Sequence, residues 1–226
     1  MEPREPAARA NGIVRRFPVA GDVVVALDHV DVELEAGRIT VIAGPSGSGK
    51  STLLSLLSCV QRPDEGSVHV GSTDVLSLGR GGRRRLRRDR LGIVLPQPSD
   101  NLLDRLDARG NLEWAARQRR ADRPAGDFDE LLGSVGLAGK AARRVRELSG
   151  GEQQRLAVAC AMVGAPEMII LDEPTASLDR ANAAMLVDVL AGLGQGGTTM
   201  VVATHDPVVV EAGDAIVELD HGRRIR

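Results

Sequence analysis

The feature that most constrains this chain is a glycine-rich segment in its first quarter, Gly44-Pro45-Ser46-Gly47-Ser48-Gly49-Lys50-Ser51, followed by Thr52. It lies between an apolar run, 39–43, and a helical pattern, 51–60. Glycines allow successive backbone N–H groups to converge on phosphate oxygens, and the helix that follows adds its partial positive charge. The segment matches the P-loop pattern in full, which predicts a nucleotide-phosphate site between a strand and a helix.

Two side chains of this loop carry specific expectations. Lys50 is expected to reach the β- and γ-phosphates, and the Ser51 hydroxyl to ligate Mg²⁺. Of the 29 basic residues, only Lys50 and Lys140 are lysines. A chain that otherwise uses arginine keeps a compact ammonium in the P-loop, which supports a phosphate-binding role for Lys50. The loop therefore predicts ATP and Mg²⁺ as cofactors.

A pair of acids, Asp172 and Glu173, ends the apolar run 168–171. An acid at the carboxyl end of a strand beside the P-loop strand can hold Mg²⁺ and its water, which predicts Asp172 as a metal ligand. Glu173 is then placed to accept a proton from the attacking water. An apolar run ending in two acids is common by itself, so this interpretation depends on the P-loop.

Strand and helix patterns alternate along the chain, which predicts an α/β fold with a mainly parallel sheet and N-terminal antiparallel strands. Strand patterns at 29–34, 39–43, 67–70 and 91–95 give way to helical patterns, and strand patterns return at 168–171, 199–203 and 215–219. We expect a disordered tail at 1–10 and one domain at 11–226. Its sheet core should span about 11–96 and 164–226, with an inserted helical subdomain at about 97–163.

The composition is that of a globular domain, with 42% hydrophobic residues, 27% charged residues and a formal net charge of −2. The near-neutral charge and the scarcity of aromatic residues do not favour a nucleic-acid partner. Two cysteines, Cys59 and Cys160, are too few for a disulfide framework. No apolar run approaches the roughly 18 residues of a membrane span, and the start lacks a signal-peptide core. These observations favour a cytosolic setting.

The segment Leu148-Ser149-Gly150-Gly151-Glu152-Gln153 lies roughly 100 residues after the P-loop. Ser149 is a candidate N-cap for the helical stretch 154–163, and the two glycines leave its N–H groups open to an anion. A P-loop, then this segment, then a strand ending in Asp-Glu resembles the ABC ATPase family over about 11–226. Within that family, the chain is most similar to ATPases of lipoprotein-release and macrolide-export permeases and of the cell-division type.

The resemblance implies roles for further residues. Gln97 corresponds to the Q-loop glutamine, which contacts Mg²⁺ or water, and Asp179 belongs to the D-loop Ser177-Leu178-Asp179. His205 corresponds to the switch histidine, which stabilises the γ-phosphate and the positioned water. Phe17 corresponds to the aromatic residue that stacks on adenine. Without the resemblance, a lone histidine at a strand end would more often be structural. Phe17 is one of only three aromatic residues, which makes a core role less expected than usual, and that role is its alternative.

The resemblance also implies partners. A second copy of the chain would form an ATP-dependent homodimer, in which Ser149, Gly150, Gly151 and Glu152 face the γ-phosphate of the partner's ATP. An integral membrane permease would hold the chain at the cytoplasmic face of the cell membrane. The implied function is ATP hydrolysis coupled to export or to lipoprotein, drug or peptide extrusion. The alternative is a cell-division ATPase that gates a cell-wall enzyme across the membrane without transport.

Two surface features leave alternatives open. The segment 80–90 contains seven arginines and one acid, Asp89. It is expected to be a solvated helix face, with anionic lipid headgroups or nucleic acid as alternatives. Leu102 and Leu103 form an apolar pair in the polar loop after Gln97, which predicts a permease-docking surface. Alternatively, both leucines pack under the helical subdomain.

Overall fold

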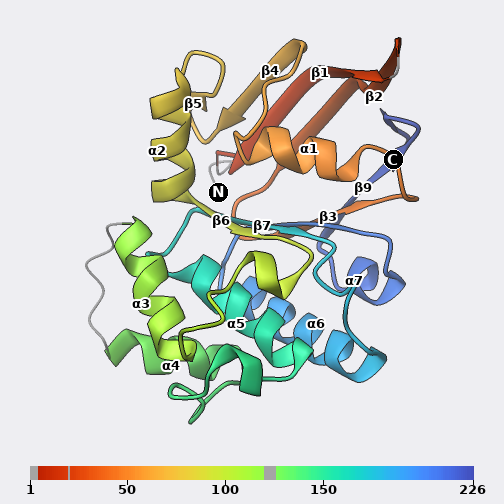
Figure 1. Ribbon diagram of the computed structural model, residues 1–226. Helices are drawn as coiled ribbons and strands as arrows, with labels where there is room; N and C mark the ends of the chain where they lie inside the picture. Colours follow the sequence, from red (N-terminus) through yellow and green to blue (C-terminus); the bar gives the residue numbers. More distant parts are fainter. Residues whose placement is uncertain (1–4, 20, 120–125) are drawn as a thin grey trace.

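The computed structural model describes residues 5–19, 21–119 and 126–226, and its strands form two sheets (Figure 1). The first sheet is antiparallel, in the order β2-β1-β4-β5. Its strands are β1 (Ala8–Val19), β2 (Asp22–Leu34), β4 (Glu65–Val70) and β5 (Thr73–Asp74). The second sheet has the order β10-β9-β3-β8-β7-β6 and is parallel except at β10. Its strands are β3 (Ile39–Ala43), β6 (Leu91–Val94), β7 (Met168–Asp172), β8 (Met200–Thr204), β9 (Ala215–Asp220) and β10 (Arg223–Arg224).

The first strand begins earlier than the sequence indicated. Ala8 and Ala10 are fully buried, and both pair with β2 on one side and with β4 on the other. Residues 8–10 therefore belong to the sheet, and the expectation of a tail through residue 10 is wrong for them. The part of the expected tail at 1–4 lies outside the described residues.

The helices lie on both sides of the larger sheet. Helix α1 (Lys50–Leu57) lies between the two sheets, where its leucines pack against residues of β1, β2 and β4 (Figure 1). The other helices are α2 (Arg80–Arg90), α3 (Ala108–Arg119), α4 (Gly126–Ser134), α5 (Gly150–Met162), α6 (Arg180–Gln195) and α7 (Pro207–Glu211), with short 3₁₀ turns η1 (Pro98–Asp100) and η2 (Val145–Glu147). In the part of the chain that the structure describes, none of them is long and apolar enough to cross a bilayer.

Successive residues of the central strands point into two different hydrophobic cores. Val41 of β3 and Ile169 of β7 belong to the core shared with α5 and α6, whereas Ile42 and Ile170 belong to the core shared with α1. This alternation follows from the two-residue period of a strand. A strand buried on both faces needs apolar residues at every position, which explains the unbroken apolar runs in the sequence.

The fold class agrees with the prediction: a mainly parallel sheet, N-terminal antiparallel strands, and helices between β6 and β7. Helix α5 connects this helical part to the rest, because it contacts α3 and α4 as well as β6 and α6. Leu102 is only 5% exposed and packs in the core beneath these helices. The prediction that Leu102 forms an exposed docking surface is therefore wrong, and Leu103 is half-buried.

Candidate nucleotide site

The P-loop connects the carboxyl end of β3 to α1, and its backbone adopts conformations that require glycine. Gly44 has a φ of 147° and Gly49 a φ of 104°. A Cβ atom on Gly44 would lie 2.2 Å from the carbonyl oxygen of Leu219, and one on Gly49 would lie 2.5 Å from that of Ala26. Both positions exclude a side chain on conformational and steric grounds, so the loop can pass close to its neighbours.

Three predicted side chains meet at this loop. The Lys50 ammonium is buried and donates hydrogen bonds to the carbonyl oxygens of Gly44 at 2.8 Å and Pro45 at 3.0 Å. It also lies 3.5 Å from Oε1 of Glu173. Nδ1 of His205 lies 3.1 and 3.0 Å from the two carboxylate oxygens of Glu173. The carboxylate of Glu173 thus lies between a cation at the phosphate loop and an imidazole at the end of β8.

Glu173 holds an uncommon backbone conformation. Its φ is 44°, in the left-handed region that side-chain-bearing residues seldom occupy. Its N–H donates to the carbonyl oxygen of Ala203 in β8 at 2.8 Å, which fixes this conformation. Backbone strain of this kind is concentrated at functional sites. Here it turns the side chain of Glu173 away from the line of β7 and toward Lys50.

Ser51 and Asp172 form a second pair of oxygen-bearing groups beside this carboxylate. The Ser51 hydroxyl donates to Oδ1 of Asp172 at 3.1 Å. Burial raises the pKa of Asp172, and the nearby charge of Glu173 raises it further, against the lowering effect of the Ser51 hydrogen bond. A hydroxyl and a partly buried carboxylate side by side fit a hard divalent cation that takes oxygen ligands, such as Mg²⁺.

A hollow of about 460 Å³ opens above the P-loop. The predicted residues Ser46, Gly47, Gly49, Lys50, Ser51, Thr52 and Glu173 line it, together with Val24, Val25, Ala26, His221 and Gly222. Sequence reasoning missed the last five. Phe17 does not line the hollow. It pairs across the β1–β2 hairpin with Val24, and Val24 does line the hollow. The Arg15 guanidinium lies 4.5 Å from the centre of the Phe17 ring and covers one face of it.

The turn between β9 and β10 supports the P-loop from the C-terminal part of the chain. The N–H of Gly222 donates to the carbonyl oxygen of Ser48 at 3.1 Å, and the carbonyl of Gly222 accepts from the N–H of Asp28 at 2.8 Å. Gly222 therefore joins the P-loop to β2. The adjacent His221 has an almost fully exposed side chain at the rim of the hollow. The only sequence signal that could have placed His221 at the hollow was its position directly before a turn glycine.

Ser149 caps α5, as the sequence predicted, and the helix begins at Gly150, four residues before the predicted stretch. The hydroxyl of Ser149 accepts from the N–H of Glu152 at 3.3 Å, and Oε2 of Glu152 accepts from the N–H of Ser149 at 2.9 Å. This reciprocal capping box fixes the first turn of α5. Lys140 donates to Oε1 of Glu152. The hydrogen bonds from Lys140 and from the Ser149 backbone lower the pKa of the Glu152 carboxyl.

Asp179 caps α6. Its carboxylate accepts from the backbone N–H of Asn182 at 2.8 Å and from the Asn182 side-chain amide at 2.9 Å. These hydrogen bonds lower the pKa of Asp179. The same Asn182 side chain packs against Gly151: a Cβ atom on Gly151 would lie 2.2 Å from the side-chain oxygen of Asn182. Asn182 therefore links the predicted D-loop to the start of α5.

The structure does not bring every predicted residue to the hollow. None of the residues Ser149, Gly150, Gly151, Glu152 and Asp179 lines it. Gln97 is exposed, and within the described residues its side chain makes no hydrogen bond to Ser51, Asp172 or Glu173. Its loop is held instead by Asn101, whose side-chain amide donates to the carbonyl oxygen of Gln97 at 2.8 Å and to that of Leu95 at 2.9 Å.

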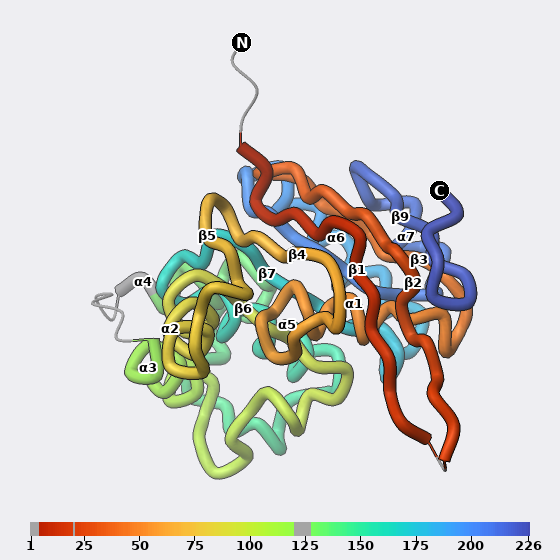
Figure 2. Tube along the Cα trace, turned by 90° about the horizontal axis from the view of Figure 1, so that it is seen from above, coloured from red at the N-terminus to blue at the C-terminus, as the bar shows by residue number. Residues whose placement is uncertain are grey.

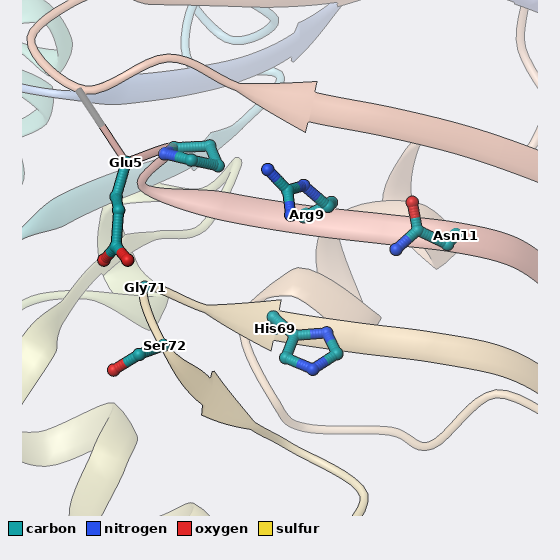
Figure 3. A pocket seen from close by; sticks show the side chains of 7 residues that line it. Glu5, Arg9, Asn11, His69, Gly71 and Ser72 are labelled. Atoms are coloured by element: carbon teal, nitrogen blue, oxygen red, sulfur yellow. The ribbon is translucent and has the colours of Figure 1, made fainter. Parts of the chain in front are cut away.

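A second hollow, of about 210 Å³, is lined by residues of β1, of β4 and of the turn after β4, and is shown in Figure 3. It is lined by Glu5, Pro6, Arg9, Asn11, His69, Gly71 and Ser72, none of which belongs to a predicted motif. The guanidinium of Arg9 lies 3.0 Å from the carboxylate of Glu33, so its charge is already neutralised. The P-loop hollow is therefore the better candidate for an anionic nucleotide.

Comparison with known proteins agrees with this geometry. The sequence model of the ABC transporter family matches residues 27–176. The chain is 39% identical over 222 residues to the macrolide export ATP-binding/permease protein MacB of Burkholderia cenocepacia, covering 97% of this chain and 32% of that protein. It is 36% identical over 220 residues to MacB 1/2 of Paracoccus denitrificans, covering 96% of this chain and 33% of that protein. The chain thus spans about a third of the length of these relatives.

Solved structures give the same result. The ATP-binding cassette MJ0796, in a dimeric post-hydrolysis state bound to ADP and Pi, superposes with a TM-score of 0.85, 31% identity and 97% coverage of both chains. The cbiO1 protein of Clostridium perfringens, part of the ABC transporter complex cbiONQ, gives 0.86 at 25% identity, covering 99% of this chain and 88% of that one. The family match covers most of the chain and includes the P-loop, Asp172 and Glu173. This chain belongs to the ABC transporter family, as an ATP-binding cassette with the ATPase fold.

Proposed function

We propose that this chain hydrolyses Mg-ATP in a nucleotide-sandwich homodimer and thereby drives a membrane permease. The observation that carries the proposal is the convergence of Lys50, Ser51, Asp172, Glu173 and His205 at the carboxyl ends of three adjacent parallel strands. Polar groups of this kind at that edge of a parallel sheet are where α/β proteins bind nucleotides.

Each residue has a chemical role in this proposal. Lys50 and the P-loop N–H groups bind the β- and γ-phosphates. Ser51 and Asp172 would hold Mg²⁺, which neutralises charge on those phosphates when bound. Glu173 accepts the proton of the attacking water, because its carboxylate is the basic group that faces Lys50. His205 holds that carboxylate in place through Nδ1.

The second half of the site is proposed to come from another copy of the chain. The start of α5 carries N–H groups and glycines suited to an anion, yet it does not line the hollow of its own chain. The dimeric state of MJ0796 supports the same arrangement here. We place Ser149 to Glu152 of one copy over the nucleotide of its partner, with Asp179 near the contact between the copies.

The proposed partner is an integral membrane permease in a separate chain, which holds this cassette at the cytoplasmic face of the membrane. The relatives are named as ATP-binding/permease proteins for macrolide export. Their names support a role in export, or in the extrusion of a drug, lipoprotein or peptide. Because Leu102 is buried, the docking surface is better placed on the exposed loop residues Gln97, Ser99 and Asp100.

The proposal is tested by measuring ATP turnover of the purified chain with and without Mg²⁺. Wild type should hydrolyse ATP only with the metal, and Lys50→Ala should lose at least about a hundredfold in turnover, because a preorganised charge at the phosphates is removed. Arg85→Ala, at an exposed side chain of α2 that does not line the hollow, is the control and should keep wild-type turnover. Equal rates for wild type and Lys50→Ala would reject the assignment of the P-loop.

A further inference from the structure

Four arginines gather where the start of α2 meets the segment after α1: Arg62, Arg80, Arg83 and Arg87, here called the arginine cluster. Nη1 of Arg87 donates to the carbonyl oxygen of Cys59 at 2.7 Å. Nη2 of Arg62 donates to the carbonyl oxygens of Leu78 at 2.5 Å and Leu76 at 3.3 Å. These two guanidinium groups are held by neutral carbonyls, so the contacts fix their positions without cancelling their charge.

The cluster lacks an acidic partner among the residues that the structure describes. No carboxylate forms an ion pair with any of its four arginines, and Nε of Arg83 is buried without a hydrogen-bond partner. Burial lowers the pKa of Arg83, and the neighbouring charges of Arg62 and Arg87 lower it further. A buried N–H without an acceptor is unfavourable, and like charges held together add to that cost.

The helix itself adds positive charge at this point. Arg80 and Arg83 lie in the first turn of α2, which contains no acid, and its N-cap Gly79 provides no side-chain hydrogen bond. The N-terminal end of a helix carries a partial positive charge and favours acidic residues in its first turn. The sequence places arginines there instead. A local conflict of this kind is expected where function rather than stability selects the residues.

Other arginines of the same helix show what a structural role looks like here. Arg88 forms two hydrogen bonds to the carboxylate of Asp89, at 2.6 and 2.9 Å. Arg90 forms two to Glu167, at 2.6 and 2.5 Å. The chain therefore pairs arginines with acids within α2 itself but leaves the arginine cluster unpaired. Arg80, Arg83 and Arg87 are spaced to lie on one face of α2, and Arg62 reaches the carbonyl of Leu78 just before this helix.

We infer that the arginine cluster is a binding site for a phosphate-bearing anion, separate from the nucleotide site. Planar guanidinium groups bind phosphate oxygens with two hydrogen bonds each, and within the described residues no carboxylate pairs with these four. None of its residues lines the P-loop hollow, and α2 lies at the opposite side of the molecule from the C-terminal strands (Figure 2). The phosphate can come from an anionic phospholipid headgroup or from a soluble phosphate compound.

The test compares two double variants of the full chain with equal changes in charge. Arg80→Gln with Arg83→Gln removes half of the cluster. Arg85→Gln with Arg105→Gln is the control, because both side chains are exposed and lie outside the cluster. None of these four side chains has an ion-pair or hydrogen-bond partner in the described part of the chain, so folding should survive in both variants. Thermal unfolding checks this, and the cluster variant should melt at or above wild type.

The first arm measures binding to vesicles that contain phosphatidylglycerol and to vesicles of phosphatidylcholine alone. A lipid source predicts binding only to the anionic vesicles, with roughly a fivefold loss for each cluster arginine removed and a smaller loss in the control. The second arm titrates pyrophosphate with the P-loop saturated by ADP. A soluble source predicts a rise in melting temperature that the cluster variant loses and the control keeps. Equal losses in both variants, or no response in either arm, overturn the inference.

Discussion

The ammonium group of Lys140 and the carboxylate of Glu152 are joined by a hydrogen bond, while the other carboxylate oxygen caps the first turn of α5. In the proposed dimer, the start of α5 faces the triphosphate of the partner copy. An unpaired Glu152 would place a negative charge next to those phosphates. Lys140, one of only two lysines in the chain, removes that charge.

Lys140→Ala should therefore weaken ATP-dependent dimerisation about three- to tenfold, since the carboxylate of Glu152 then repels the nucleotide. Dimerisation is measured by sedimentation with ATP in the Glu173→Gln background, which slows hydrolysis. Adding Glu152→Gln to Lys140→Ala should restore the affinity, because the repelling charge is gone. If Lys140 acted only as a structural tether, glutamine at 152 would restore nothing, so an unrescued double variant contradicts the electrostatic explanation.

Glu173→Gln should bind ATP normally and hydrolyse it roughly 10²- to 10⁴-fold more slowly, because the amide cannot accept the proton of the attacking water. Lys50, Ser51 and Asp172 remain to hold the nucleotide. Single-turnover hydrolysis and equilibrium ATP binding separate the two effects. The variant should also accumulate as a dimer at saturating ATP. Rapid turnover by Glu173→Gln would show that another group is the base.

Asp172→Asn should raise the melting temperature of the metal- and nucleotide-free protein at pH 7 by roughly a few °C. Burial raises the pKa of Asp172, so its ionised form destabilises the fold. That destabilisation sets in as the pH rises from the ordinary value of 3.8 toward the raised folded value, and it is absent below 3.8, where the group is protonated in both states.

Melting curves at pH 3 and pH 7 test this sign. The two proteins should differ at pH 7 and converge at pH 3, while Asp172→Asn loses Mg-dependent hydrolysis at neutral pH. Asp188→Asn, at an exposed position on α6, is the control and should change neither property. A lower melting temperature for Asp172→Asn at pH 7 would mean that its ionised carboxylate supports the fold.

Two neighbouring glycines at the start of α5 should respond in opposite ways to the same change. Gly151→Ala would place a Cβ 2.2 Å from the Asn182 side chain, so we expect a loss of roughly 1–3 kcal/mol in stability. Gly150→Ala faces open space and should be neutral or stabilising by up to about 1 kcal/mol. Denaturant unfolding of both variants measures the difference. Adding Asn182→Ala to Gly151→Ala should recover only part of the loss, because the Cβ atom of residue 182 would still lie 2.7 Å from the new Cβ atom.

The sequence predicted best those elements whose pattern is decided locally. The run 39–43 coincides with β3, and 168–171 with all but the last residue of β7, because strands buried on both faces are apolar at every position. The start of α5 was also predictable, since Ser149 and Glu152 satisfy each other within one turn. The P-loop residues are consecutive in the chain, so their proximity was never in question.

Features that depend on distant contacts were missed or misread. Ala8 and Ala10 have weak strand propensity and are strand residues because β2 and β4 flank them. Leu102 looked exposed because its neighbours in the chain are polar, yet helices far along the sequence cover it. His221 lies at the nucleotide hollow only because Gly222 binds the carbonyl of Ser48. A local sequence pattern carries no information about such contacts between residues that are far apart in the chain.

The alternation of β7 between two cores links the carboxylates of Asp172 and Glu173 to both layers of the molecule. Ile169 and Leu171 rest on the layer of α5 and α6, and Ile170 rests on the layer of α1, immediately before Asp172 and Glu173. Enlarging or truncating a side chain in either layer displaces the same five-residue strand. Random mutagenesis should therefore yield variants that fold but hydrolyse ATP slowly, with substitutions far from ATP on both sides of the sheet. In these variants a carboxylate after β7 would be out of position.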